Sequence, residues 1–61
     1  MNLCTLRKKK NLTMREVSAK ASISESMYSL IENGKRRPSV EAAKRIAAVL
    51  GFDWTKFYQD K

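Results

Sequence analysis

The sequence has no histidine and only one cysteine, Cys4. Cys4 cannot form an internal disulfide, and without histidine or a second cysteine it has no partners for a zinc site. Only six carboxylates occur, scattered along the chain, so no catalytic triad or acid–base pair can be assembled. We therefore expect no metal, no cofactor, no small-molecule substrate and no enzymatic activity.

Long apolar runs and strand patterns are also missing. No segment approaches the roughly 20 apolar residues that a membrane-spanning helix needs, and the N-terminus does not resemble a signal peptide. Gly34 and Gly51 both stand where a helix would end, so no glycine-rich phosphate loop is predicted. No stretch alternates apolar and polar residues as a strand does. These absences predict an all-α protein without a membrane segment, located in the cytoplasm.

The length sets a further limit. Sixty-one residues lie near the lower size at which a domain folds unaided, and 43% of them are hydrophobic. We expect one domain over residues 1–61 with one core and little room for a substrate pocket.

Positive charge is what the chain has in excess. Thirteen Lys and Arg stand against six Asp and Glu, a net charge of +7. The cations cluster in two runs, residues 7–10 and 35–37. Basic runs are commonly solvated surface, but these two flank a helix-turn-helix pattern, which favours a nucleic-acid partner.

Residues 13–33 contain that pattern, two short helices separated by a three-residue break. The first helix begins with a capping box, in which Thr13 and Glu16 satisfy each other's backbone amides. Ser24 is a good N-cap for the second helix, which we place at about Glu25 to Glu32. This is how a helix-turn-helix presents one helix to DNA.

The second helix divides into two faces at about 100° per residue. The inner face is assigned to the core: Ser24, Met27, Tyr28 and Ile31. The outer face holds Glu25, Ser26, Ser29, Leu30 and Asn33. These outer side chains are mostly short, uncharged and able to hydrogen-bond, which suits contact with base edges. Leu30 is open to two interpretations, a contact with a thymine methyl group or a place at the edge of the core.

Three further helices are predicted to support the motif. They run from Asn2 to about Lys9, from a cap at Ser39 to Leu50, and from a cap at Asp53 through Trp54 to about Tyr58. The first helix has Leu3 and Leu6 inside. The helix after Ser39 has the clearest apolar stripe of the chain: Val40, Ala43, Ile46, Ala47 and Leu50.

Three segments of the sequence together resemble the phage Cro and repressor family, also called the xenobiotic response element family. They are EVSAKASIS at residues 16–24, YSLIENGKRRPS at 28–39 and AAVLG at 47–51. The match covers nearly the whole chain and is most specific at residues 31–35 followed by Pro38-Ser39. The resemblance implies a compact five-helix, lambda-repressor-like DNA-binding domain that regulates transcription, in most members as a dimer.

The resemblance also implies roles for single residues. Those at positions that meet bases or nearby phosphates are Ser24, Glu25, Ser26 and Leu30, and the outer face adds Ser29. Those near the DNA backbone are Met14, Lys35 and Arg36, to which we add the cations Arg15 and Arg37. Arg7 and Glu32 match a pair that forms a partly buried, structural salt bridge in related domains.

This sequence departs from the family pattern at several positions. Ser22 stands where a glycine often adopts a left-handed turn, at a cost on the order of 1 kcal/mol. Met14 replaces a polar residue that often touches phosphate. Glu25 and Leu30 replace the common glutamine-type readers, so the target sequence is open; Glu25 could accept from a cytosine amino group.

Together these patterns predict a sequence-specific, double-strand DNA-binding transcriptional regulator, preferably a repressor, that binds a palindromic operator as a homodimer. The dimer is expected to be weak and to assemble on DNA. The candidate surface of the dimer is the aromatic tail of Trp54, Phe57 and Tyr58. The alternative role for these side chains is packing in the core of their own protomer, and this role is favoured for Trp54. A rival interpretation is an antitoxin or anti-regulator module that binds a protein through this tail. The charge of +7 would also permit nonspecific nucleic-acid binding.

Overall fold

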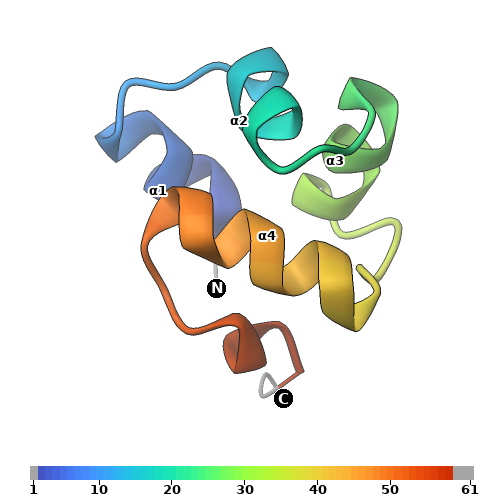
Figure 1. Ribbon diagram of the computed structural model, residues 1–61. Helices are drawn as coiled ribbons and strands as arrows, with labels where there is room; N and C mark the ends of the chain where they lie inside the picture. The colour runs from blue at the N-terminus through green and yellow to red at the C-terminus, as the bar shows by residue number, and fades with distance from the viewer. Residues whose placement is uncertain (1, 59–61) are drawn as a thin grey trace.

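The computed structural model describes residues 2–58 and places four α-helices and one 3-10 helix along them (Figure 1). In chain order these are α1 (Leu3–Lys9), α2 (Met14–Lys20), α3 (Glu25–Glu32), α4 (Val40–Leu50) and η1 (Trp54–Tyr58). No strand occurs within residues 2–58. The all-α prediction is confirmed, and the fifth element is a short 3-10 helix where an ordinary helix was predicted.

Each α-helix begins at a polar side chain that accepts a backbone N–H from its first turn. The acceptors are Asn2, Thr13, Ser24 and Ser39. At α2 the capping box is complete, because Glu16 N donates to Thr13 Oγ1 at 3.1 Å and Thr13 N donates to Glu16 Oε1 at 2.8 Å. Since these caps satisfy amides that a short helix leaves unpaired, they fix where each helix starts.

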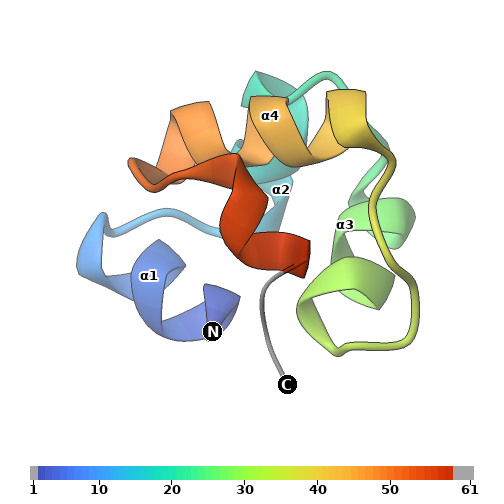
Figure 2. The same cartoon turned by 90° about the horizontal axis from the view of Figure 1, so that it is seen from below.

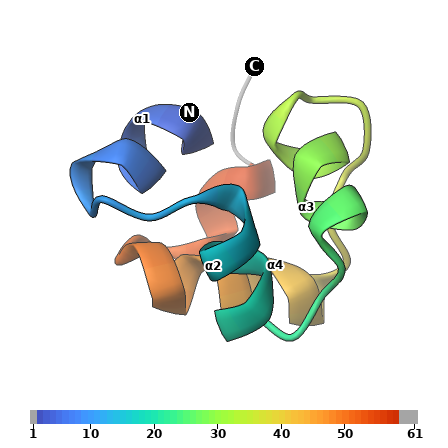
Figure 3. The ribbon, with the colours of Figure 1, turned by 90° about the horizontal axis from the view of Figure 1, so that it is seen from above.

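The helices surround a small core. Seen from above, α2 lies between α1 and α3, and α4 lies behind it (Figure 3). α2 packs against both α3 and α4, and η1 packs against α4. Seen from below, η1 lies on the side of α4 away from α2, between α1 and α3 (Figure 2). The helix-turn-helix is therefore supported by α4 from behind.

The connected core draws on all four α-helices. Its buried members are Leu3, Val17, Ala21, Tyr28, Ile31, Ile46 and Leu50. Two residues that were predicted to face the core, Val40 and Ser24, are exposed instead. Val40 is 50% exposed, because the buried stripe of α4 begins one turn later, at Ala43. Ser24 is exposed, because its hydroxyl is held at the surface by accepting the Met27 amide.

Two corners between helices use a left-handed backbone without glycine. Asn11 has a φ of 58° and Ser22 a φ of 60°. Ser22 occupies the turn of the helix-turn-helix, where its amide donates to Ala19 O at 3.2 Å and the Ile23 amide donates to Ser18 O at 3.0 Å. The left-handed conformation predicted for Ser22 is thus present, with the steric strain that it carries for a residue with a Cβ.

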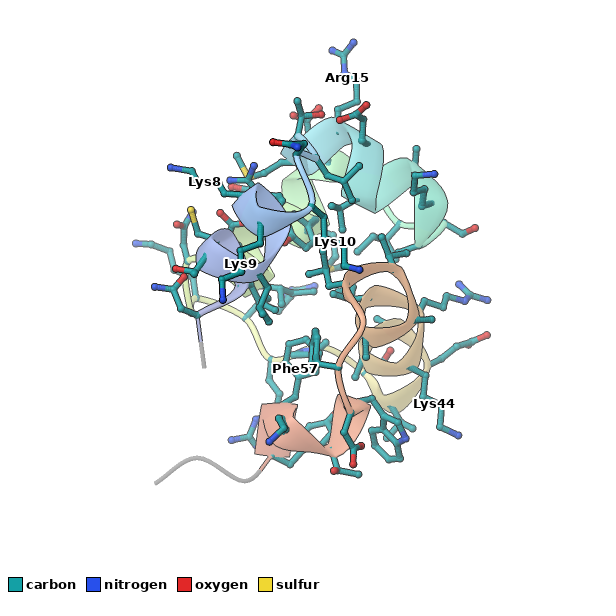
Figure 4. All side chains as sticks on the ribbon, turned by 90° about the vertical axis from the view of Figure 1, so that its left-hand side faces the viewer. Lys8, Lys9, Lys10, Arg15, Lys44 and Phe57 are labelled. Carbon is teal, nitrogen blue, oxygen red and sulfur yellow. The ribbon has the colours of Figure 1, made fainter. Side chains whose placement is uncertain are left out.

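The aromatic tail is half-buried against the rest of the protein. Phe57 packs against the core and lies 5.5 Å from Phe52 between ring centroids. Tyr58 donates its hydroxyl to Pro38 O at 2.9 Å, which ties η1 to the loop before α4. Trp54, which the sequence favoured for the core, instead stacks edge-on against Tyr58 at 6.0 Å. The core position belongs to Phe57 because it points back between α1 and α4 (Figure 4).

Candidate nucleic-acid interface

The outer face of α3 is largely accessible. Glu25, Ser26 and Asn33 are exposed, Leu30 is 40% exposed, and Ser29 is half-buried. The opposite face, with Tyr28 and Ile31, is buried. α3 therefore has one face fixed in the core and one face free to meet a partner, as the helical periodicity predicts.

A shallow hollow lies on this outer face. It is lined by Met14 of α2 together with Glu25, Ser26, Ser29 and Leu30 of α3. Met14, assigned from the resemblance to the DNA backbone, thus lies beside the residues assigned to bases. A helical wheel of α3 could not reveal this, because Met14 comes from the neighbouring helix.

Glu25 has a cationic neighbour across the turn. Arg15 Nε of α2 lies 3.7 Å from Glu25 Oε1, and both side chains are largely exposed. An exposed pair at this distance contributes little stability. It does offset the negative charge of Glu25, which alone would repel a phosphate backbone.

The basic loop after α3 is held against that helix by its backbone. The amides of Lys35 and Arg36 both donate to Leu30 O, at 2.8 and 3.2 Å. Gly34 has a φ of 75°, which lets the chain reverse at the helix end. The side chains of Lys35, Arg36 and Arg37 remain exposed. A fixed backbone with exposed cationic side chains is suited to phosphate contact beside a helix in the major groove.

Arg7 and Glu32 form an ion pair that joins α1 to α3. Arg7 Nε lies 3.0 Å from Glu32 Oε1, and Arg7 Nη2 donates to Glu32 Oε2 at 3.1 Å. A third bond runs from Arg7 Nη1 to Leu12 O at 2.9 Å. The side chains are only 12% and 7% exposed, respectively. This bidentate geometry fixes the C-terminal end of α3 relative to α1.

The pair also sets the charge state of its members. The Arg7 guanidinium, hydrogen-bonded to Glu32, lowers the pKa of that carboxyl and outweighs the opposite effect of burial. The bond to Glu32 raises the pKa of Arg7 in turn. Nearby, burial raises the pKa of Tyr28, whose hydroxyl has no hydrogen-bond partner within residues 2–58. Neither Arg7 nor Glu32 is available to a ligand.

The N-terminal basic run divides in the structure. Arg7 is used internally, while Lys8 and Lys9 point away from the protein (Figure 4). Lys10 extends toward the end of α4, where its Nζ would lie 3.4 Å from a Cβ placed on Gly51. A cation there complements the negative end of the α4 dipole. The four cations of this run therefore differ in exposure and partners, since Arg7 is paired with Glu32 as the family resemblance implied and Lys10 follows the end of α1.

The described residues were also searched for a metal site and for a membrane-spanning helix. No group of three His, Cys, Asp or Glu side chains within residues 2–58 could hold a metal ion. None of the helices there is long and apolar enough to cross a bilayer.

Comparison with known proteins agrees with this geometry. A family model described as helix-turn-helix matches residues 5–57. The chain is 48% identical over 54 residues to the uncharacterized HTH-type transcriptional regulator YqaF of Bacillus subtilis (strain 168), covering 88% of this chain and 71% of that relative.

A second relative is the uncharacterized HTH-type transcriptional regulator y4dJ of Sinorhizobium fredii (strain NBRC 101917 / NGR234). It is 38% identical over 50 residues, which is 82% of this chain and 65% of y4dJ. The matched segments include α2, the turn and α3, and this family comprises DNA-binding proteins, not enzymes. The chain belongs to the Cro/C1-type helix-turn-helix family of DNA-binding transcriptional regulators.

Proposed function

We propose that this protein is a sequence-specific, double-strand DNA-binding repressor that reads a palindromic operator as a homodimer. The observation that carries the proposal is the outer face of α3, where exposed side chains able to hydrogen-bond lie beside exposed cations in the next loop. A face that only needed solvation would carry more Lys and Glu than this one does.

Recognition would combine two physical terms. Lys35, Arg36 and Arg37, with Arg15 at the other end of the motif, would release counterions from phosphates and set the register. α3 would lie in the major groove, where Ser24, Ser26 and Ser29 can bond base edges and Leu30 can contact a thymine methyl. Glu25 could accept from a cytosine amino group while Arg15 offsets its charge.

The homodimer is proposed because one protomer offers little reading surface. α3 has eight residues, about two turns, so useful affinity calls for two half-sites about one helical turn of DNA apart. Trp54, Phe57 and Tyr58 are the candidate contacts, but each is already half-buried within its own protomer. The dimer surface would be small and the dimer weak in solution, with DNA holding two copies together. Repression needs no contact beyond occupation of the operator, which is why we prefer it to activation.

Selection from a random duplex pool tests the core of the proposal. We expect an enriched motif with two-fold symmetry and half-sites about 10 base pairs apart. Sedimentation should then find mainly monomer at low micromolar concentration and two protomers per operator duplex. Absence of any enriched motif would favour the protein-binding or nonspecific alternatives. One protomer per duplex, with no loss on scrambling a half-site, would contradict the homodimer.

The phosphate assignments have their own test. Lys35→Ala or Arg36→Ala should weaken all duplexes about equally and lower the slope of log affinity against log salt by roughly one. Lys44→Ala is the matched control, because Lys44 lies over the Trp54 ring at 5.2 Å and points away from the motif (Figure 4). Unchanged slopes in both loop variants would remove these residues from the interface.

A further inference from the structure

A groove of about 590 Å³ lies between α3, the loop after it and the start of α4. Its apolar lining includes Ile23, Met27, Ile31 and Ala42. The groove flanks the inner side of α3 and, of the residues assigned to bases, includes only Ser24. The short chain predicted little room for such a pocket, yet its volume falls within the range of small-molecule sites.

The rim of the groove is cationic. Among residues 2–58, Arg36, Arg37 and Arg45 line it, together with one carboxylate, Glu41. Glu41 is already paired, since its Oε2 accepts from Arg45 Nη2 at 2.6 Å. Three positive charges and one negative leave an excess of two positive charges around an apolar floor.

Arg36 is the rim cation best placed to change partners. Among the described residues it pairs with no carboxylate, and its Nη1 lies 3.5 Å from Met27 Sδ, a weak acceptor within the groove. Arg37, by contrast, lies over the Tyr58 ring, 5.7 Å from the centroid. An anion in the groove would offer Arg36 a much stronger acceptor than the methionine sulfur.

Two helices also begin at this groove. Ser24 and Ser39, the caps of α3 and α4, both line it. The N-terminal end of a helix carries partial positive charge, so both helix starts add to the field of the arginines. Apolar floor, arginine rim and helix starts all favour one kind of occupant, a molecule with an apolar body and a negative charge.

We propose that this groove binds a small organic anion, a carboxylate or sulfonate on an apolar body, and that the bound anion competes with DNA phosphate for Arg36. Arg36 belongs to both the groove and the proposed DNA contacts, so an anion in the groove would draw its guanidinium away from the DNA and place a second negative charge beside the phosphate, which electrostatic repulsion disfavours. The competition rests on the proposed DNA function, whereas binding in the groove does not. The groove is thereby an effector site within the DNA-binding unit itself.

Binding is tested on the whole chain without DNA. Anilinonaphthalene sulfonate serves as fluorescent probe, decanoate below its micelle concentration as competitor, and decanol as the uncharged control. We expect the probe to bind and decanoate to displace it, with decanol much less effective. Ala42→Glu places a carboxylate in the groove and should weaken probe and decanoate by at least about tenfold. Ala48→Glu adds the same charge to the exposed face of the same helix and should change binding by less than about twofold.

Ala42→Leu fills the groove without adding charge and should also weaken binding. It therefore tests the proposal even if Ala42→Glu lowers the melting temperature too far for binding to be measured. Thermal unfolding of each variant checks the fold. Equal weakening by the two glutamate substitutions, or decanol competing as well as decanoate, would overturn the proposal.

The competition is tested with a duplex at low salt. Decanoate should weaken duplex binding by the wild-type chain and by Ala48→Glu, but not by Ala42→Glu. Decanoate that occupies the groove without changing duplex affinity would overturn the link through Arg36. If the wild-type chain binds no duplex, the proposed function fails, and groove binding is judged on the titrations alone.

Discussion

The two faces of α3 differ in what they can tolerate. The inner face is packed into the core: Tyr28 is 0% and Ile31 5% exposed, and Glu32 at the end of the helix forms an ion pair with Arg7. The outer face, with Ser26 and Leu30, makes few contacts with the rest of the protein. One face of α3 thus holds residues on which folding depends, and the opposite face holds residues that can vary with the binding partner.

This separation lets a small DNA-binding domain change its target without rebuilding its core. Substitutions on the inner face should change the free energy of unfolding, and those on the outer face should change DNA discrimination alone. The predictions below probe that division, beginning with the largest effect.

Removal of the Tyr28 side chain should be the most damaging change. Tyr28→Ala should cost about 3–5 kcal/mol, comparable to the whole stability of a domain this small, and leave much of the chain unfolded. Tyr28→Phe is the control: the hydroxyl lies near the Glu32 carboxylate but makes no hydrogen bond of good geometry within residues 2–58, so its loss should cost at most about 1 kcal/mol. Urea unfolding followed by circular dichroism measures both. A cost above about 1 kcal/mol for Tyr28→Phe would imply a bond that the hydroxyl makes elsewhere.

The Arg7–Glu32 pair should come next. Removing either partner strands the other where it is mostly buried, so each Ala variant should lose about 2–3 kcal/mol. A double-mutant cycle should give a coupling above about 1 kcal/mol. The exposed pair of Arg45 and Glu41 is the matched control, with a coupling of about 0.3–0.5 kcal/mol. Equal coupling in the two cycles would mean that α3 is not anchored by this contact.

Acid should weaken the same anchor by a smaller amount. The pKa of Glu32 is below its ordinary value of 4.5 in the folded protein, so its contribution is complete well above that pH. The contribution is lost as the pH falls through the lowered pKa. Glu32→Gln should therefore lose less stability than the wild type between neutral pH and pH 3. Asp53, whose pKa is lowered by the Thr55 amide, remains in both proteins and leaves a common acid dependence. Parallel acid curves for the two would contradict the assignment.

The outer face should respond least in stability. Ser26→Ala should change discrimination between the selected operator and its single-base variants by roughly 1 kcal/mol. The free energy of unfolding should stay within about 0.5 kcal/mol, because the Ser26 side chain is exposed. Competition binding with a panel of duplexes gives the first quantity and urea unfolding the second. Equal losses of affinity on operator and random DNA would assign Ser26 to the DNA backbone. No loss on either would remove it from the interface.

Local chemistry made most of the fold predictable. The caps at Thr13, Ser24 and Ser39 and the stops at Gly34 and Gly51 depend on a few neighbouring residues, and the structure places each where it was predicted. Helical periodicity gave the faces but not their limits. It could not tell that Val40 lies outside the core and that the buried stripe of α4 begins at Ala43.

Contacts between distant segments were not predictable from pattern alone. Arg7 and Glu32 are 25 residues apart and were paired only through the family resemblance. Helical spacing places Arg7, four residues after Leu3, on the inner face of α1 and leaves Lys8 outside, but it does not identify Glu32 as the partner of Arg7. The groove at Arg36 combines two helices and a loop, and the hollow containing Met14 combines α2 with α3. Such surfaces depend on how elements pack, which charge and periodicity do not encode.

The left-handed Ser22 at the corner between α2 and α3 has a consequence for heat tolerance. A residue with a Cβ loses about 1–2 kcal/mol in this conformation, and glycine would recover that at an entropic loss of about 0.4–1 kcal/mol. The net gain lies between about 0 and 1.6 kcal/mol, and each 1 kcal/mol corresponds to roughly 4–8 °C in melting temperature for a domain of this size. Ser22→Gly should therefore raise the melting temperature while leaving every proposed DNA contact in place.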